Sequence, residues 1–398
     1  MGYRDEWMRV GKTESISLDS TAIEKIQPLH LVLVEEPEAH LHAQVQQVFI
    51  KKAYELLRNH DDLKKPTDPK TPDRFSTQLV ITTHSSHVAH EADFSCLRYF
   101  RRRRALSRAH APTTTVANLS TVFGTGNETS RFVARYLKAT HCDLFFADAA
   151  IFVEGQAERI LVPQFIQNHF HDLNRRYVTL LDVGGSHIQR FKPLVDELGI
   201  ATLIISDLDA ALKTKVKDKI GAERTVSKGV SPALNMKQIT TNSVLKSWHP
   251  KIEKIDELVA LTEDQQIFDS DGECPLYVAF QKPTTINEDA PKSETVIPRT
   301  FEDALIYANM DTLADITGSA ISNKIRKVVE ANLSGEDLQN RLFELLKGSE
   351  KAAFALDCLF IEAPQVLVPP RYISCGLTWL QEYLTETSSD TNGVPSDE

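Results

Sequence analysis

The sequence predicts an α/β protein with two domains, at residues 1–145 and 146–384. A chain of 398 residues is long enough to bury more than one hydrophobic core. Between residues 149 and 210, short apolar runs of strand type alternate with helical stretches of about 10 to 15 residues, which indicates a parallel sheet covered by helices. The earlier part carries apolar strands of its own, and the polar end, 385–398, predicts a disordered tail.

Composition and charge exclude several classes of protein. Hydrophobic residues make up 41% and charged residues 25%, as in an average soluble globular protein. No apolar run approaches the roughly 20 residues that cross a bilayer, and no signal peptide is evident, so we expect a cytoplasmic protein without a membrane partner. A net charge of −10 argues against a protein that coats nucleic acid, but metal-dependent nucleases concentrate carboxylates and remain compatible with it.

In the first domain, a loop with three prolines at 60–78 separates two apolar strands. The expected strands are 29–36 and 78–86, a basic edge strand lies within 95–108, and helices are expected at 42–58 and 128–140. In the second domain, three apolar strands alternate with helices and are followed by a polar stretch, 211–298, that we read as an insertion. The strands are 150–155, 177–185 and 201–210, and the helices are 156–169, 187–198, 301–310, 320–333, 335–347 and 349–360.

The first strand of the chain delivers two acids to its end. In LVLVEEPEAHLH (31–42), Glu35 could hold Mg²⁺ through water and Glu36 could orient an attacking water, as ATP hydrolysis requires. His84 follows the second strand, where an imidazole could contact a γ-phosphate. This pair resembles the Walker B and switch-histidine segments of ABC-type ATPases, in the form found in the OLD (overcoming lysogenization defect) family. The resemblance implies ATP as a cofactor of the full-length protein.

The glycine-rich loop that cradles phosphates, GxxxxGK[ST], is not recognisable in this sequence. The segment Gly11-Lys12-Thr13 has no glycine five residues earlier and lies too close to the Walker B strand. We therefore expect only part of an ABC-type ATPase domain here, one that does not hydrolyse ATP by itself.

The second domain places acids at the ends of its strands, where parallel sheets hold functional groups. The first strand supplies Glu154, and Glu158 follows in the first helical turn. Asp182 ends the second strand, before the pair Gly184 and Gly185, which lets the backbone approach closely. Asp207 and Asp209 end the third strand on one side of the extended chain. Acids gathered in this way repel one another unless cations bind, and hard oxygen ligands suit Mg²⁺, Mn²⁺ or Ca²⁺.

This order of motifs resembles the Toprim domain, and VEGxxE, LDVGG and SDLDA look most like the OLD nucleases, including the nuclease subunit of Gabija defence systems. The resemblance implies a Toprim domain with a helical C-terminal extension. It assigns Glu302, and less surely Asp303, to a second metal site, and Lys351 to the stabilisation of charge on the cleaved phosphate. It also implies a homodimer and a helicase-like partner beside some members.

These residues predict a DNA endonuclease that hydrolyses phosphodiesters with two metal ions. The catalytic residues would be Glu154, Glu158, Asp207, Asp209 and Lys351. We assign Glu154, Asp207 and Asp209 to one ion and Glu158, Asp182 and Glu302 to the other. The run Arg98, Arg101 to Arg104 and Arg108 could contact DNA phosphates, or only protect an exposed strand edge.

Two other functions remain open at this point. A haloacid-dehalogenase-like phosphatase would use Asp207 as a nucleophile and Asp209 beside it, because SDLDA also places DxD after an apolar strand. That function leaves the upstream acids without a task. Alternatively, the chain is a nucleotide-sensing ABC-like and Toprim scaffold that cleaves nothing.

Overall fold

The computed structural model describes residues 29–39, 41–42, 44–46, 48, 51–53, 55, 76–103, 113–217, 223–268, 274–286, 294–347, 350–361 and 363–389. The chain divides into two compact units, an N-terminal unit, Met1–Ala92, and a C-terminal unit, Asp93–Glu398. The segment Gly11-Lys12-Thr13 and the end of the expected tail, 390–398, lie outside the described residues.

The N-terminal unit is built on two parallel strands that pair in register, so that Leu29 lies opposite Ser76 and Glu35 opposite Thr82. Within the expected helix at 42–58, residues 44–46, 48, 51–53 and 55 are helical. The strands and the helix that follows them are β1 (Leu29–Glu35), β2 (Ser76–Thr82) and α3 (Ser86–Glu91).

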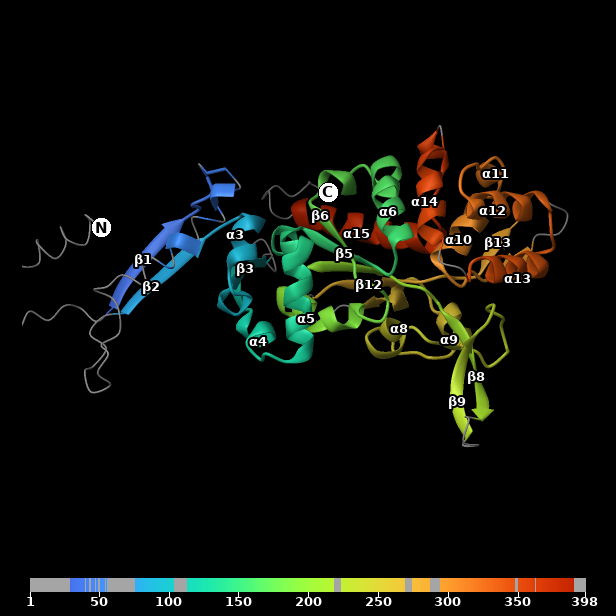
Figure 1. Ribbon diagram of the computed structural model, residues 1–398, viewed down its shortest axis with the longest axis horizontal. Coiled ribbons are helices and arrows are strands. Elements are labelled where there is room, and N and C mark those ends of the chain that lie inside the picture. The colour runs from blue at the N-terminus through green and yellow to red at the C-terminus, as the bar shows by residue number, and fades with distance from the viewer. Residues whose placement is uncertain are drawn as a thin grey trace, which may run out of the picture. The chain divides into compact units, whose positions relative to one another are not determined.

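The C-terminal unit has a five-stranded sheet in the order β11-β12-β7-β5-β6, in which all neighbours are parallel except the edge strand β11. Figure 1 shows helices on both sides of these strands. The three predicted strands form one side of this sheet. Its strands are β5 (Ala149–Val153), β6 (Val178–Asp182), β7 (Ala201–Ile205), β11 (Ile267–Phe268) and β12 (Leu276–Ala279).

Smaller strands and the helices complete the C-terminal unit. The strands are β3 (Arg98–Arg103), β4 (Thr113–Asn118), β8 (Ala210–Lys217), β9 (Glu223–Gly229), β10 (Ile239–Thr240), β13 (Thr284–Ile286) and β14 (Glu294–Val296). The helices are α4 (Ser120–Phe123), α5 (Glu128–Tyr136), α6 (Gln156–His169), α7 (Lys192–Leu198), α8 (Ser243–Ser247), α9 (Ile255–Ala260), α10 (Phe301–Ala308), α11 (Met310–Leu313), α12 (Ala320–Glu330), α13 (Gly335–Leu345), α14 (Lys351–Leu359) and α15 (Arg371–Ser389).

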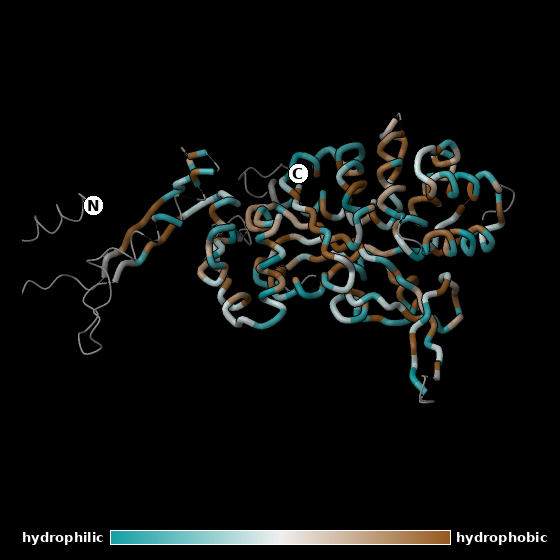
Figure 2. The backbone as a smooth tube through the Cα atoms, viewed as in Figure 1, coloured by the Kyte–Doolittle hydropathy of each residue, from teal (hydrophilic) through white to brown (hydrophobic). Residues whose placement is uncertain are grey.

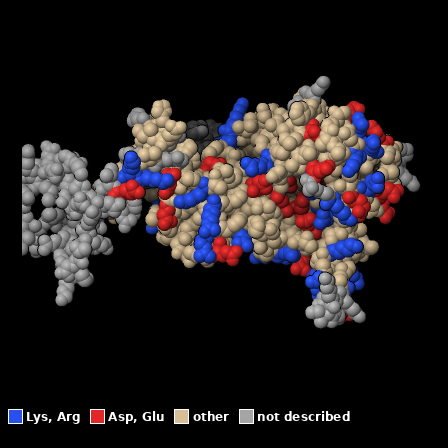
Figure 3. Space-filling view, in the orientation of Figure 1, with Lys and Arg blue, Asp and Glu red and all other residues tan. Residues whose placement is uncertain are grey.

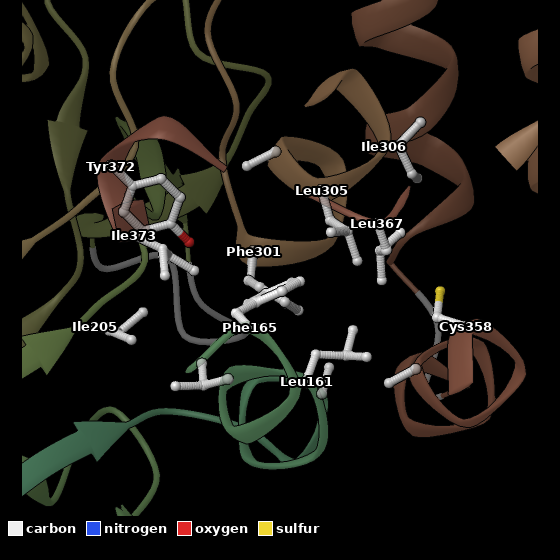
Figure 4. Close-up of a cluster of buried hydrophobic side chains, with 14 of the residues drawn as sticks. Leu161, Phe165, Ile205, Phe301, Leu305, Ile306, Cys358, Leu367, Tyr372 and Ile373 are labelled. Atoms are coloured by element: carbon white, nitrogen blue, oxygen red, sulfur yellow. The ribbon is translucent and has the colours of Figure 1, made fainter. Parts of the chain in front are cut away.

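The central strands are buried on both faces because successive side chains point to opposite sides. Ile151 and Val153 of β5 join the core formed with α6, α10 and α15, whereas Phe152 packs on the other side, 5.3 Å from the ring centroid of Phe191. Figure 2 shows hydrophobic residues concentrated along these strands. Figure 4 shows Phe165 and Phe301 meeting in the core, so the second half of α6 is held against the start of α10.

Three features differ from the sequence-based expectation. β12 lies inside the stretch 211–298, which the sequence suggested was an insertion. The sequence did not reveal this strand, because four residues are too few to give a periodic signal. The segments β3, β4 and α5 belong to the same compact unit as the central sheet, although the sequence suggested a boundary at residue 145. Helix α15 continues to Ser389, into the stretch expected to be disordered.

Helix α15 packs closely against β7 at one glycine. A Cβ atom at Gly376 would lie 2.7 Å from Cδ1 of Leu203, so a larger residue there would require the Leu203 side chain to shift.

Candidate active site

Glu154 and Asp207 meet at the carboxyl edge of the sheet. Each follows the end of a parallel strand, and β5 and β7 are neighbours. Oε1 of Glu154 accepts a hydrogen bond of 3.2 Å from the backbone N–H of Asp207 and a second hydrogen bond from the hydroxyl of Ser206. The two acids that the sequence placed at strand ends therefore lie within direct reach of each other.

An amide from the polar stretch 211–298 joins this pair. Nδ2 of Asn242 donates to Oε1 of Glu154 at 2.6 Å and to the backbone carbonyl of Asp207 at 2.9 Å. Its Oδ1 accepts from the N–H of Val244 at 2.9 Å and so caps α8. Asn242 thus ties the start of this helix to both strand ends.

Asp207 is held by a second amide. Nε2 of Gln281, just beyond β12, donates to Oδ1 of Asp207 at 2.9 Å and to the hydroxyl of Tyr372 at 3.2 Å. Oε1 of Gln281 accepts from the N–H of Leu208 at 2.6 Å. Burial, and then the charges of Glu154 and other nearby acids, raise the pKa of Asp207 well above its usual value.

Asp209 lies at the rim of the site in a left-handed backbone conformation, with φ of 47°. Its Oδ1 pairs with Nη2 of Arg299 at 2.9 Å, and its backbone N–H donates to the Arg299 carbonyl at 3.3 Å. The Asp209 charge is close enough to raise the pKa of Glu154, which burial raises first. Asp209 therefore belongs electrostatically to the same cluster.

The helices contribute a second group of charges. Glu158, in the first turn of α6, and Glu302, in the first turn of α10, are each 3% exposed. Burial, followed by the Glu302 charge, raises the pKa of Glu158 to about 8. Nζ of Lys351 lies 2.7 Å from Oε2 of Glu302, which also accepts from the hydroxyl of Thr300 at 2.9 Å.

Lys351 is the cation that faces these acids. Burial alone would lower its pKa, but the charges of Glu302, Asp207 and Glu158 outweigh that effect and raise it. We call the five acids and this lysine the acid cluster: Glu154, Glu158, Asp207, Asp209, Glu302 and Lys351.

Two predicted ligands have other neighbours. Both oxygens of Asp303 are engaged in a capping box at the start of α10, where they accept from the backbone N–H groups of Arg299 and Thr300 at 2.7 and 2.8 Å. Burial raises the pKa of Asp182, and the charges that act against this come from Arg159 and His141. Among the described residues, neither carboxylate hydrogen-bonds to a member of the acid cluster.

The glycine pair after β6 lies against the acid cluster. A Cβ atom at Gly185 would be 2.1 Å from Oε2 of Glu154, so a side chain at this position would collide with that carboxylate. The loop bends at Gly184, which has a φ of +74°. The sequence predicted this close backbone approach, and the structure shows which carboxylate it accommodates.

The chemistry of the acid cluster suits divalent cations. Burial and the repulsion between neighbouring negative charges raise the pKa of Glu154, Glu158 and Asp207. A bound cation would relieve this repulsion, and carboxylate oxygens are hard ligands that suit Mg²⁺, Mn²⁺ or Ca²⁺. Among the described residues, no three His, Cys, Asp or Glu side chains converge on one point as they stand. As they stand, the carboxylates accept hydrogen bonds from Ser206, Asn242 and Gln281, and two of them pair with Arg299 and Lys351.

The N-terminal unit brings together two of its three predicted residues. Nε2 of His84 lies 3.4 Å from Oε1 of Glu36, and the Glu36 N–H donates to the carbonyl of Thr82 at 3.0 Å. Glu35 is exposed at the end of β1. Glu38, not singled out from the sequence, accepts hydrogen bonds of 2.6 Å from the Thr83 hydroxyl and from the His84 N–H. It thereby joins the two strand ends.

Comparison with known families agrees with this description. Residues 145–209 match the model of the "Overcoming lysogenization defect protein-like, TOPRIM domain", and residues 11–89 match that of an "AAA ATPase domain". The chain therefore carries a Toprim domain of the OLD-like type and an ATPase segment. The family resemblance and the fold class inferred from the sequence are confirmed.

Among curated proteins, the chain is similar to two endonucleases. It is 26% identical to "Endonuclease GajA" of Bacillus cereus (strain HuB5-5) over 380 residues, which cover 89% of this chain and 49% of that protein. It is 25% identical to the GajA of strain VD045 over 207 residues, 52% of this chain and 30% of that protein. The chain thus spans about half the length of the first of these relatives.

Among solved structures, the chain is similar to the C-terminal region of the Burkholderia pseudomallei OLD protein, with 20% identity and a TM-score of 0.34. The match covers 60% of this chain and 99% of that one. The C-terminal region of the Xanthomonas campestris pv. campestris OLD protein gives 19% identity and a TM-score of 0.32, over 62% and 99%.

Five residues around the acid cluster were not found from the sequence. Ser206 directly precedes the DxD pair and could have been suspected, and Arg299 precedes the acidic helix. No local pattern marks Asn242, Gln281 or Tyr372, because they reach the site only through the folding of distant segments.

The described part of the chain holds no helix with the length and hydropathy needed to cross a bilayer.

Proposed function

We propose that this chain is a metal-dependent endonuclease that hydrolyses DNA phosphodiester bonds at the acid cluster. The supporting observation is the meeting of Glu154 and Asp207, with Lys351 and Glu302 beside them, at the carboxyl edge of a Toprim sheet. The similarity to proteins named endonucleases gives the reaction class. We take DNA as the substrate, as the Toprim resemblance implies.

Two groups of carboxylates would hold the ions. Glu154, Asp207 and Asp209 would hold one, and Glu158 and Glu302 would hold the other. The assignments of Asp182 and Asp303 stay predictions, since Asp303 caps α10 and the charges that act on Asp182 come from Arg159 and His141. When bound, divalent ions would supply a nucleophilic hydroxide and would neutralise charge on the leaving 3′ oxygen.

The chain's own residues prepare this site. Asn242 and Ser206 hold Oε1 of Glu154, and Gln281 holds Asp207, so the carboxylates are oriented before a substrate arrives. Nζ of Lys351 pairs with the Glu302 carboxylate. Its ammonium group would turn to the phosphate of the substrate and stabilise the charge that develops on its oxygens.

The N-terminal unit would take part in binding ATP in the full-length protein, with Glu36 and His84 facing the γ-phosphate side. ATP hydrolysis, a homodimer and a helicase-like partner remain predictions that follow from the family resemblance. The cytoplasmic location remains an expectation from the sequence.

The phosphatase alternative is less well supported. Its nucleophile would be Asp207, one of whose carboxylate oxygens accepts a hydrogen bond from Gln281. It would also leave Glu154, Glu158 and Glu302 without a role, although the charges of Glu302 and Glu154 help to raise the pKa of Glu158.

The test incubates supercoiled and linear DNA with the full chain and Mg²⁺, Mn²⁺ or Ca²⁺. Cleavage that needs a divalent ion and is lost in Glu154→Gln and Lys351→Ala supports the nuclease. Glu336→Gln and Lys324→Ala, on exposed positions of α13 and α12, serve as matched controls and should cleave normally. Turnover of p-nitrophenyl phosphate without DNA cleavage would favour the phosphatase, and neither activity would favour the scaffold.

A further inference from the structure

The hairpin of β8 and β9 projects from the C-terminal unit directly beside the acid cluster. β8 begins at Ala210, the residue after Asp209, and pairs with β9 in antiparallel register from Ala211 and Gly229 outward (Figure 1). The described side chains of β9 are all exposed, and so are those of β8 beyond Leu212.

The ribbon carries an excess of positive charge. Its described side chains include one acid, Glu223, and four cations, Lys213, Lys215, Arg224 and Lys228. Figure 3 shows Lys and Arg side chains on the described part of this hairpin. The whole chain has a net charge of −10, so this concentration of cations runs against the general charge of the protein.

The cations lie on both faces of the ribbon. Lys213 and Lys215 share one face, because residues two apart in a strand point to the same side. Arg224 and Lys228 lie on the other, opposite Val216 and Leu212 in the register. The ion pairs of the first face, Lys213–Glu253 and Lys215–Glu223, are both 3.5 Å long and exposed to solvent, so they are weak and leave the lysines available to a stronger anion.

The base of the ribbon is fixed to the acid cluster. Ala210 and Ala211 pair with β10 and are completely buried. Arg299, which pairs with the Asp209 carboxylate at 2.9 Å, also donates from Nε to the carbonyl of Ala210 at 3.4 Å. A polymer held by the ribbon would therefore be held in a defined place relative to the proposed metal ligands.

We propose that the β8–β9 hairpin is an arm that binds the phosphate backbone of duplex DNA beside the bond to be cleaved. The proposal rests on the function proposed above, in which the acid cluster acts on DNA. A strand rises about 3.3 Å per residue, so Lys213 and Lys215 lie up to roughly 13 and 20 Å from Asp209 along the ribbon. These distances correspond to about four to six base-pair steps of 3.4 Å.

This arm recognises the backbone rather than the sequence. Lysine contacts phosphate as a point charge, and the hydroxyls of Thr225 and Ser227, which share a face with Lys213 and Lys215, can donate to phosphate oxygens. Each phosphate contact releases condensed counterions, so binding through the arm depends strongly on salt.

The experiment measures binding of a fluorescein-labelled 30-base-pair duplex to the full chain by anisotropy, in EDTA and at 50 to 200 mM KCl. The variants are Lys213→Gln with Lys215→Gln, Arg224→Gln with Lys228→Gln, and all four together. The matched control is Lys324→Gln with Lys327→Gln, on exposed positions of α12. Melting temperatures verify that each variant is folded.

We expect each hairpin pair to weaken binding about tenfold at 100 mM KCl and to reduce the slope of log Kd against log salt by about 1 to 2, whereas the control pair binds like the wild type. If the wild type and the variant with all four substitutions bind DNA equally well, the proposal is overturned, even if the wild type cleaves DNA. If no divalent ion supports cleavage but binding still depends on the hairpin, the nuclease function fails and the arm stands.

Discussion

Nδ2 of Asn242 lies 2.6 Å from Oε1 of Glu154, although 88 residues separate the two along the chain. The same amide group reaches the backbone carbonyl of Asp207, and the other end of the side chain caps α8. Asn242 therefore orients the central carboxylate of the proposed metal site without being an acid itself.

Asn242→Ser tests this orienting role. Serine can still cap the helix, but its side chain is too short to reach Glu154. We expect Mn²⁺ to bind about 10- to 100-fold more weakly, which is the usual effect of removing a residue that hydrogen-bonds to a metal ligand. The melting temperature of the protein should change little. Isothermal titration calorimetry measures the affinity, and unchanged Mn²⁺ binding would remove Asn242 from the site.

Lys351→Ala separates the structural and chemical roles of the lysine. The change leaves Glu302 buried without its cation, so the metal-free protein should lose stability. DNA cleavage should fall at least about 100-fold, because charge on the phosphate is no longer stabilised. In the double variant Lys351→Ala with Glu302→Gln, the melting temperature should return toward that of the wild type, whereas the rate of DNA cleavage should stay low. Recovery of cleavage in the double variant would contradict the assigned role.

The metal-free protein should become less stable as the pH rises from 5 to 8. The pKa of Glu158 is raised to about 8 in the folded state, so the folded protein binds a proton there that the unfolded chain has already released. The stabilisation is complete below the ordinary pKa of a glutamic acid and is lost as the pH approaches 8. Melting temperatures in EDTA should show this decline.

The variant Glu158→Gln should flatten that decline, because glutamine has no proton to lose. Added Mg²⁺ should raise the melting temperature more at pH 8 than at pH 5, since cations and protons compete for the same carboxylates. An equal decline in wild type and Glu158→Gln would assign the pH dependence to other groups.

Gly185→Ala should disturb the site through a single methyl group. The added Cβ would lie 2.1 Å from Oε2 of Glu154 and would push that carboxylate away from its partners. We expect cleavage to fall at least about tenfold, measured by nicking of supercoiled DNA. Gly126→Ala is a stringent control for glycine loss, because a Cβ atom there would meet open space, whereas its φ of +62° adds backbone strain that Gly185→Ala does not. Similar losses in both variants would mean that the contact with Glu154 is unimportant.

The sequence by itself determined the strands and the acids at their ends. The apolar runs of β5 and β7 are readable because a strand buried on both faces must be apolar throughout, and parallel strands end at one edge. That rule alone brought Glu154 and Asp207 together. Gly184 and Gly185 were readable for a similar reason, since only glycine permits their bend and their close approach.

Only the tertiary structure decided which groups surround those acids. Asn242, Gln281 and Tyr372 come from segments with no motif, and a hydrogen bond between distant residues leaves no periodic trace in the sequence. The tertiary structure also gave Asp303 a capping role and Asp182 different neighbours, because a carboxylate acts on whatever lies within a few ångströms of it. Sequence spacing locates such groups along a strand or helix, whereas packing determines what each of them faces.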